Sequence, residues 1–417
     1  MIDGTTHIVG AGLAGLSAGV NLVDHGRKVI VHELARHAGG RCRSFFEPAL
    51  GLSIDNGNHL LLSGNRHALA FLERIGGRDL VTGPEKSEFA FFDLASGARW
   101  VLQPNDGPLP WWIFSESRRV PGTNPGDYVA LLALLFSGEQ VTVGEKLDVR
   151  SNLYQKLMRP VLLAALNCDP EEGSARLAGA VIRETLARGG KACRPLIAAG
   201  GLGPALIDPA ISRIRNKGGK VTFDHGLRSI EFTGLRAGAL VFSDERLELE
   251  EGDDVILAVP AWVARTLLPE LIVPTEYRSI LNAHFKIRPP PGLPRITGII
   301  NATAEWLFAF DDRLSVTVSS ADRFNEAERV PLARQIWSEI ACAAGLAGEL
   351  PPWQIVKERR ATFAATPAQN AQRPRAKTRW TNLYLAGDWT STGLPATIEG
   401  AIRSGETAAK LAIRARF

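Results

Sequence analysis

The chain has 417 residues, of which 45% are hydrophobic and 22% charged, and its formal net charge is +4 at pH 7. Because single hydrophobic cores stop growing near roughly 250–300 residues, a chain of this length predicts two domains. The longest apolar run, Val129 to Phe136, is far shorter than the roughly 20 residues that cross a bilayer. No block of lysines and arginines is present, so we expect no nucleic-acid partner.

Four cysteines are widely spaced and form no Cys-x-x-Cys pair: Cys42, Cys168, Cys193 and Cys342. This spacing favours neither a zinc site nor a redox pair, and we expect no metal. Residues 7–20 are apolar, but glycines interrupt them and no cleavage site follows. The sequence therefore predicts a cytoplasmic protein with reduced thiols.

The first 33 residues have the pattern of a complete strand–helix–strand unit. A short apolar strand, residues 7–12, ends in glycines and is followed by a helix over Leu13 to His25. A second strand, Lys28 to His32, ends at the acidic residue Glu33. A glycine-rich turn between strand and helix, with an acid about 20 residues later, is typical of dinucleotide-binding folds.

The glycines of this turn, Gly10-x-Gly12-x-x-Gly15, each meet a different requirement. Gly10 permits a tight turn, Gly12 lets the backbone approach a pyrophosphate, and Gly15 lets the helix pack against the strand. The free N–H groups of the helix start then face the phosphates, and Glu33 can accept hydrogen bonds from the ribose. The predicted residues at this end of the dinucleotide are Gly10, Gly12, Leu13, Ala14, Gly15, Glu33 and Leu34.

A second motif, Gly39-Gly40-Arg41, follows six residues after Glu33. With both motifs at this separation, the chain resembles the GGR-motif flavoproteins, which include monoamine oxidases, protoporphyrinogen oxidase and phytoene desaturases. The resemblance implies that the dinucleotide is FAD and that Gly40 and Arg41 contact its diphosphate or flavin edge. One departure is Ala35, since an arginine often occupies that position in the superfamily.

The last 40 residues supply the other half of the predicted site. A strand at 382–386 ends in Gly387-Asp388-Trp389, and residues 395–405 open the final helix. The resemblance implies that Gly387 and Asp388 contact the ribityl and pyrophosphate region. It also implies that the helix start at Thr397 and Ile398 points at the flavin, where its dipole stabilises negative charge. This segment has no cysteine, so we expect a non-covalent flavin.

A third piece, Gly226-Leu227, resembles the family strand pair that covers the adenine, and the backbone of Leu227 is the expected contact. The fold class is therefore α/β: a discontinuous Rossmann-type FAD-binding domain with an α+β substrate domain that has a sheet floor and a helical cap. The expected FAD-binding segments are 1–85, 200–268 and 376–417, and the expected substrate segments are 86–199 and 269–375.

Residues 54–65 refine the family assignment. Together with residues 40–45 and the helix over Arg159 to Asn167, they resemble the hydroxysqualene dehydroxylases, the squalene-associated flavoproteins of hopanoid biosynthesis. This resemblance implies reductive removal of an allylic hydroxyl from hydroxysqualene to give squalene, with hydride from reduced flavin. It also places Asn58 and His59 beside the flavin ring and requires an apolar tunnel for a long isoprenoid.

The departing hydroxyl needs an acid. His59 is the first candidate, although it could instead hydrogen-bond the backbone or the flavin. Asp55 is the second, although an aspartate before Asn-Gly is as typical of a turn. His284 and Glu305 are weaker candidates, and the remaining histidines look like surface residues.

The sequence leaves open three alternative functions and a possible contact with a membrane surface. Residues 111–114 and 129–136 could contact a membrane surface or line the core. A phytoene-type desaturase and an amine oxidase share the fold, but Trp380 and Tyr384 do not match the aromatic pair of amine oxidases. A non-catalytic FAD-binding isoprenoid escort is the third alternative. Only one nucleotide fold is visible, so the electron donor is external and unidentified.

Overall fold

A parallel sheet forms the centre of one half of the molecule. The computed structural model describes residues 4–414. The five strands have the order β10-β2-β1-β14-β20, and every neighbouring pair is parallel. Their bounds are β1 Thr5–Val9, β2 Lys28–His32, β10 Lys220–Thr222, β14 Asp254–Leu257 and β20 Leu383–Leu385. The two ends of the chain therefore join in one sheet, as the α/β prediction requires.

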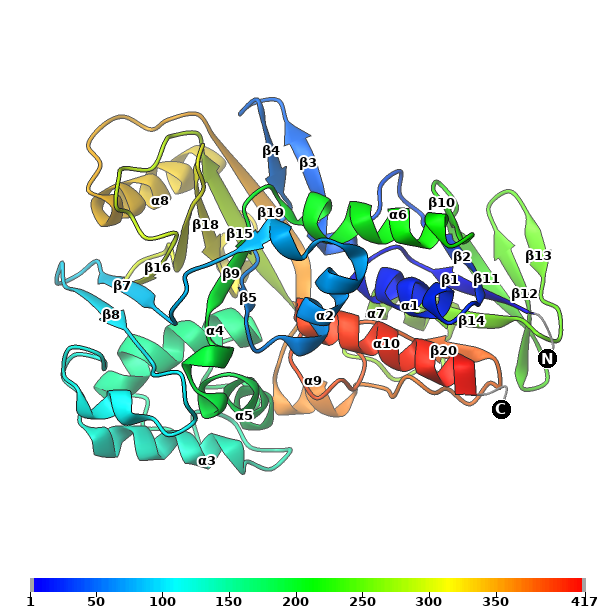
Figure 1. Cartoon of the computed structure of the whole chain (residues 1–417), viewed down its shortest axis with the longest axis horizontal. Helices are drawn as coiled ribbons and strands as arrows, with labels where there is room; N and C mark the ends of the chain where they lie inside the picture. The colour runs from blue at the N-terminus through cyan, green and yellow to red at the C-terminus, as the bar shows by residue number, and fades with distance from the viewer. Residues whose placement is uncertain (1–3, 415–417) are drawn as a thin grey trace.

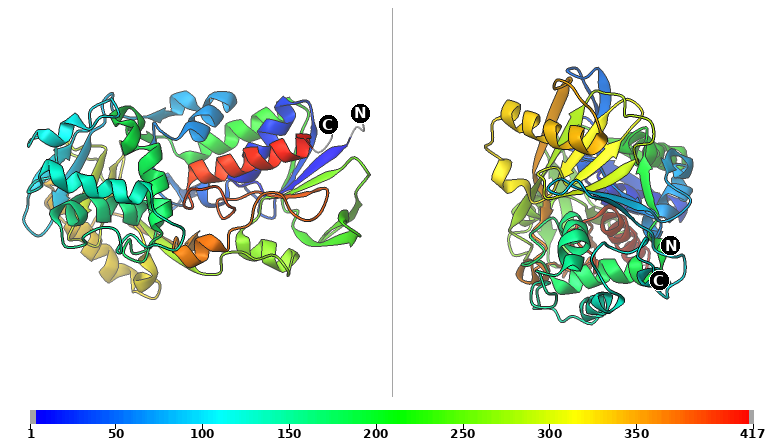
Figure 2. Two further views of the ribbon diagram at one scale, coloured as in Figure 1. Left: turned by 90° about the horizontal axis from the view of Figure 1, so that it is seen from below. Right: turned by 90° about the vertical axis from the view of Figure 1, so that its left-hand side faces the viewer.

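One face of this sheet carries three helices side by side: α1 Leu13–Asp24, α6 Asp208–Asn216 and α10 Ile398–Arg414 (Figures 1 and 2). The helices approach closely because small residues lie between them. Gly19 of α1 faces Ile214 of α6, and a Cβ on Gly405 of α10 would collide with the backbone of α1. The short helix α2, Arg66–Ile75, packs beside α10.

The other face is covered by a three-stranded antiparallel sheet and by α7, Ala261–Leu267. Its strands are β11 Leu227–Thr233, β12 Arg236–Phe242 and β13 Arg246–Glu248. The ring of His32 in β2 lies 4.7 Å from the ring of Phe242 in β12. These contacts bring residues 225–227 next to the end of β2.

A seven-stranded sheet forms the centre of the other half, with the order β19-β15-β18-β17-β16-β7-β8. All neighbours are antiparallel except β16 and β7. The long helix α8, Arg329–Ala344, packs on one face through an apolar cluster. The strands are β7 Phe89–Asp93, β8 Arg99–Leu102, β15 Tyr277–Phe285, β16 Ile296–Ile300, β17 Trp306–Ala309, β18 Leu314–Val318 and β19 Trp353–Phe363.

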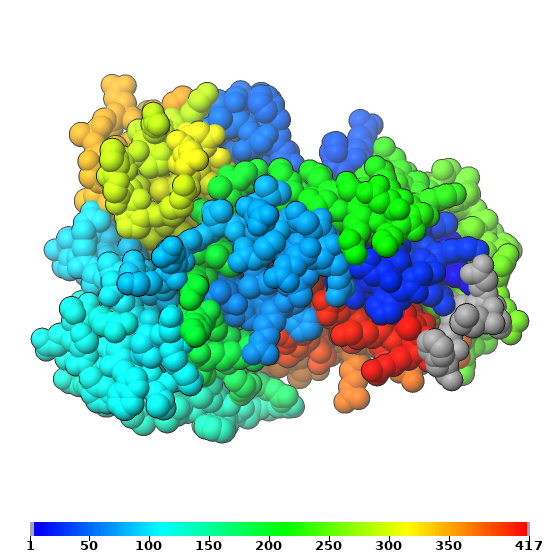
Figure 3. All heavy atoms as spheres, in the orientation of Figure 1, coloured from blue at the N-terminus to red at the C-terminus, as the bar shows by residue number. Residues whose placement is uncertain are grey.

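A helical cap covers the opposite face of this sheet, at the far end of the molecule from the termini (Figures 1 and 3). It contains η3 Trp111–Phe114, η4 Pro125–Ala130, α3 Leu131–Leu135, η5 Tyr154–Met158, α4 Arg159–Leu166 and α5 Ala175–Glu184. No helix among residues 4–414 is long and apolar enough to cross a membrane.

Short strands join the two halves. β3 Ser44–Glu47 and β4 Leu52–Asp55 form a hairpin, and β5 Leu61–Leu62 and β6 Val81–Thr82 both pair with β9 Pro195–Ala198. A last short helix, α9 Pro367–Ala371, precedes β20.

Candidate functional site

The glycine turn after β1 has the geometry that a pyrophosphate site requires. Gly10 has a φ of +105°, and a Cβ there would lie 2.5 Å from the carbonyl oxygen of Ala258. A Cβ on Gly15 would collide with the carbonyl of Gly10. At Gly12, by contrast, a Cβ would meet no protein atom within 4 Å. The protein itself therefore does not demand a glycine at position 12, which fits the close approach of a ligand to this backbone.

Glu33 and the Gly39-Gly40 pair lie against the same turn. The Glu33 carboxylate accepts hydrogen bonds from the N–H groups of Ala11 at 2.7 Å and Ala35 at 2.9 Å. The N–H of Gly39 donates to the carbonyl of Ala11 at 2.9 Å. A Cβ on Gly40 would lie 3.7 Å from Cα of Gly12. The two N-terminal motifs therefore form one continuous surface.

Arg41 and Asp388, predicted from opposite ends of the chain, form an ion pair of 2.8 Å. The carboxylate is almost fully buried, whereas 40% of the Arg41 side chain is accessible. Arg41 also donates to the carbonyl of Ala361, and Arg373 donates to the carbonyl of Asp388 at 2.9 Å. Part of the Arg41 side chain is therefore accessible to an anionic ligand.

The segment predicted at the adenine lies beside the end of β2. The N–H of His225 donates to the carbonyl of Glu33 at 2.9 Å. Leu34 is 71% exposed and packs against Gly226, just before Leu227. The predicted residues 33–34 and 226–227 are therefore neighbours.

Three buried histidines form a chain directly behind this segment, which corrects the expectation that they lie on the surface. Nδ1 of His7 lies 3.1 Å from Nε2 of His32, and Nδ1 of His32 lies 2.9 Å from Nδ1 of His225. Burial, and then the neighbouring His7 and His225, lower the pKa of His32 to about 3. Each histidine lies in or next to a strand of ordinary appearance, so no local pattern indicated the chain.

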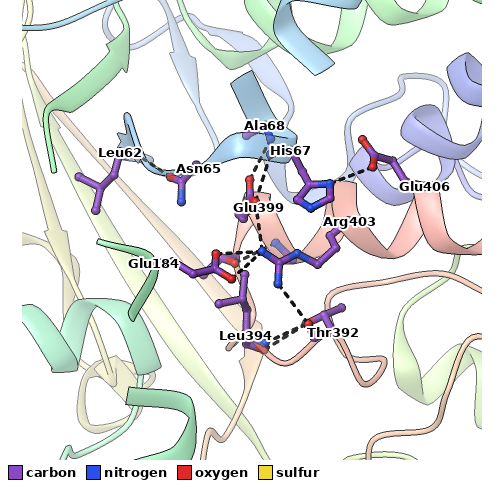
Figure 4. A network of polar contacts seen from close by, with 12 residues as sticks. Leu62, Asn65, His67, Ala68, Glu184, Thr392, Leu394, Glu399, Arg403 and Glu406 are labelled. Carbon is purple, nitrogen blue, oxygen red and sulfur yellow. Dashed lines mark hydrogen bonds and ion pairs between the residues drawn. The ribbon is translucent and has the colours of Figure 1, made fainter. Parts of the chain in front are cut away.

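The start of α10 is fixed by a network that the sequence did not predict (Figure 4). Thr397 accepts a hydrogen bond from the N–H of Gly400 at 3.0 Å and caps the helix, while the side chain of Ile398 is buried. Glu399 accepts from the N–H groups of His67 at 3.1 Å and Ala68 at 2.8 Å, at the start of α2.

Arg403 completes this network, because it bonds Glu399 at 3.3 Å and Glu184 of the cap at 2.8 Å. The network therefore links α2, α10 and the cap helix α5.

Residues 56–59, here called the flavin loop because the family resemblance predicts them beside the flavin ring, rest on the seven-stranded sheet. Oδ1 of Asn282 accepts from the backbone N–H of Asn58 at 3.2 Å, from the Asn58 amide at 3.4 Å and from the Thr317 hydroxyl at 2.9 Å. The amide of Asn282 donates to the carbonyl of Asn56 at 3.4 Å. Asn282 and Thr317 were not predicted, because they lie more than 200 residues from the loop in sequence.

The sheet face under the flavin loop, here called the floor, is polar at one end and aromatic at the other. Paired residues in a sheet point to the same side, so the pairing defines one row across all seven strands. The row contains Val356, Asn282, Thr317, Trp306, Gly298, Phe91 and Trp100. The next row contains Gln354, His284, Ser315, Phe308, Ile296 and Phe89. Polar groups therefore gather where the loop contacts the floor.

Comparisons with known proteins agree with this architecture. The family model described as flavin containing amine oxidoreductase matches residues 13–413. Hydroxysqualene dehydroxylase of Rhodopseudomonas palustris is 54% identical and that of Sinorhizobium fredii 50% identical, with 98–99% of each chain covered. The chain belongs to the flavin containing amine oxidoreductases, in the hydroxysqualene dehydroxylase branch. The structure of cyclohexylamine oxidase from Brevibacterium oxydans has a TM-score of 0.73 at 16% identity over the full length of both chains, and so shares the fold.

This flavin-containing oxidoreductase binds FAD. The described residues fit that cofactor: the backbone at Gly12 is open to a pyrophosphate, the Glu33 carboxylate lies against the same turn, and Arg41 pairs with Asp388. The assignment of individual residues to parts of FAD stays a prediction, as does the absence of a covalent bond.

The four candidate acids lie in different surroundings. Asp55 accepts from the Ser44 hydroxyl and from the N–H of Leu202 at 2.9 Å, at the start of a helix, so a capping role accounts for its burial. Burial lowers the pKa of His59 to about 4, with a further contribution from Arg41, and lowers that of His284 to about 3. Burial raises the pKa of Glu305 to about 7, although hydrogen bonds from Ser319 oppose the shift. Burial also raises the pKa of Asp55, so among the four only the two histidines have a lowered pKa.

Proposed function

We propose that this protein removes the allylic hydroxyl of hydroxysqualene reductively and releases squalene. The identity of 50–54% to two hydroxysqualene dehydroxylases over nearly the whole chain carries this proposal. We also propose that residues 1–85, 200–268 and 376–417 form the FAD-binding domain and that the remaining segments form the substrate domain. The origin of the parallel sheet's strands from residues 5–32, 220–257 and 383–385 supports the division.

The floor suits a long hydrocarbon with one polar carbon. Its aromatic part belongs to one large apolar cluster that includes Phe91, Trp306 and Phe308 and continues through Leu162 of the cap to Trp389, beside Asp388. Apolar burial would drive binding of the hydrocarbon, at about 25 cal/mol per Å² removed from water. The polar groups Asn282 and Thr317 lie at the flavin loop, where a hydroxyl-bearing carbon would be placed.

The chemistry requires one proton and one hydride for each hydroxyl removed. The C–O bond breaks, the oxygen leaves as water with a proton from the protein, and a C–H bond forms at the allylic carbon. FAD in its reduced state supplies the hydride. The residues predicted from both ends of the chain would hold the cofactor, and the apolar cluster would exclude water from the allylic carbon.

We propose Glu305 as the proton donor. A carboxylic acid with a pKa of about 7 is substantially protonated at neutral pH, whereas His59 and His284 are uncharged there. His59 is then a neutral hydrogen-bonding group of the flavin loop. If Glu305 is the donor, the dehydroxylation rate falls as the pH rises through about 7. Glu305→Gln should remove most of the rate while FAD stays bound, and His59→Asn should retain it. The opposite result would restore His59 as the first candidate.

We propose that the cap contacts a membrane surface. Six large apolar side chains are exposed there and form what we call the apolar patch: Leu109, Trp111, Phe114, Val129, Leu132 and Phe136. Phe136 is 87% exposed, and the neighbouring Trp112 and Leu134 are buried in the apolar cluster. Exposed aromatic residues of this kind insert into the membrane interface. Replacement of Trp111, Phe114 and Phe136 by serine should abolish flotation with liposomes and leave FAD binding unchanged.

The test of the reaction is direct. Purified protein with FAD, a chemical reductant and hydroxysqualene is incubated without oxygen, and squalene is measured against protein-free and FAD-free controls. Accumulation of squalene supports the proposal. Formation of conjugated polyene from phytoene without any squalene would favour a desaturase, and no reaction with either substrate would favour an escort. Oxidation of an amine would indicate an amine oxidase.

A further inference from the structure

The floor changes from polar to aromatic at Trp306. In the row across the sheet, Trp306 pairs with Thr317 on one side and with Gly298 on the other. Thr317 pairs with Asn282, which holds the flavin loop. Beyond Gly298 the row continues with the rings of Phe91 and Trp100. Trp306 is therefore the first aromatic residue of the row next to the polar pair.

The indole of Trp306 has an unused hydrogen-bond donor. The residue is 7% exposed, its ring meets Phe91 edge-on at 5.8 Å, and its Nε1 has no hydrogen-bond acceptor among residues 4–414. Indole Nε1–H can only donate, and a buried donor without an acceptor is unfavourable and uncommon. In Trp389, by comparison, Nε1 donates to the carbonyl of Val259 at 2.9 Å.

The polar neighbours of Trp306 in this row hold the flavin loop. Oδ1 of Asn282 already accepts three hydrogen bonds, and its amide donates to the flavin loop. The hydroxyl of Thr317 donates to Asn282 and accepts from the Asn58 amide at 3.3 Å. These groups are engaged in holding the loop, whereas the Nε1–H of Trp306 has no acceptor among residues 4–414.

We propose that Trp306 selects the hydroxylated substrate, with its Nε1–H donating a hydrogen bond to the substrate's hydroxyl oxygen. This inference rests on the proposed function, because it concerns the same substrate. The bond would place the C–O bond that breaks at the boundary between the polar and aromatic parts of the floor. The oxygen leaves as water, so the site favours substrate over squalene.

Ligand binding to oxidised, FAD-loaded protein tests the proposal without turnover. The perturbation of flavin absorbance is titrated with hydroxysqualene and with squalene, in the wild type and in Trp306→Phe, which keeps an aromatic ring but removes the N–H. Loss of one hydrogen bond should raise the Kd for hydroxysqualene about five- to tenfold. The Kd for squalene should stay within about twofold of the wild-type value, because squalene has no hydroxyl.

Trp100→Phe is the matched control. Trp100 lies in the same row, its Nε1 is also buried without a partner among the described residues, and it is stacked on Phe91 at the far edge of the sheet. Its replacement should leave the ratio of the two dissociation constants at the wild-type value. An equal loss of affinity for both ligands in Trp306→Phe would show that the ring only packs, and would overturn the proposal. An unchanged ratio would also overturn it.

A second measurement does not depend on folding of the variant. In the wild type with ¹⁵N-labelled indoles, hydroxysqualene should shift the Trp306 N–H resonance downfield, and squalene should not. Identical responses to both ligands would contradict the assignment. Failure of the reduced enzyme to make squalene would reject the proposed function but not this comparison of ligands, so the two failures are distinguishable.

Discussion

The buried histidine chain predicts a measurable loss of stability in mild acid. His32 is 3% exposed and lies between His7 and His225, so its imidazole stays neutral in the folded protein. Burial and the two neighbouring histidines lower its pKa to about 3, from an ordinary value of 6.5. Because the folded pKa is depressed, the unfolded chain binds a proton below about pH 6.5 that the folded chain excludes. The free energy of unfolding therefore falls as the pH decreases from 6.5 toward 3.

The size of this effect follows from the two pKa values. One histidine changes the free energy of unfolding by about 1.4 kcal/mol for each pH unit inside this window. The free energy of unfolding should therefore fall by about 2 kcal/mol between pH 7.5 and pH 5 because of His32 alone. The pKa of His7 is also lowered, by burial against the opposing effect of Asp253, and acts in the same direction. At the His225 end of the row of three histidines, the carboxylate of Glu245 lies 3.2 Å from the His225 ring.

The assay compares how steeply the free energy of unfolding changes with pH in the wild type and in variants. The contributions of titrating groups that the proteins share then cancel. Urea unfolding with saturating FAD is followed by circular dichroism from pH 7.5 to pH 5 in the wild type, His32→Phe and His37→Gln. Phenylalanine at position 32 can still stack on Phe242 but does not titrate. His37 is exposed on the segment that follows β2, and its replacement should keep the wild-type slope. An identical acid loss in His32→Phe and in the wild type would refute the reasoning.

Two further predictions concern the FAD site, and a third concerns the network at the start of α10. Gly12→Ala should change the free energy of unfolding by less than about 1 kcal/mol, because no protein atom opposes the new Cβ, yet raise the Kd for FAD at least about tenfold in fluorescence titration. A normal FAD affinity would contradict the pyrophosphate assignment. Arg41→Met should also raise the Kd for FAD at least about tenfold, since it leaves Asp388 buried without its cation; unchanged binding would remove Arg41 from the site. Glu399→Ala should cost about 2–4 kcal/mol in urea unfolding, because it removes both the cap of α2 and a partner of Arg403; a loss below about 1 kcal/mol would show that the network contributes little.

The sequence predicted those parts of the site whose stereochemistry is local. Gly10 needs a positive φ and Gly15 a close helix contact, and both requirements appear in the spacing of a short motif. The family resemblance placed Arg41 and Asp388 at the same ligand, but it did not predict the ion pair between them. The fold class followed from alternating strand and helix patterns with the two glycine motifs at the ends.

The remaining parts depend on contacts between distant segments. Asn282 and Thr317 lie in strands of ordinary appearance, and only the sheet register places them under Asn58. His7 and His32 likewise occupy plain strand positions, and their contact with His225 arises from the packing of two sheets. Helix α10 was predicted, but a sequence motif does not show that Glu399 caps a helix more than 300 residues earlier.

A single-turnover experiment tests the central claim most directly. Enzyme whose FAD has been fully reduced, with the excess reductant removed, is mixed anaerobically with hydroxysqualene, and flavin absorbance and squalene are measured in the same samples. We expect one squalene formed for each flavin reoxidised, with no reoxidation when squalene itself is added. Reoxidation without squalene, or no reoxidation while hydroxysqualene is bound, would contradict a reductive dehydroxylase.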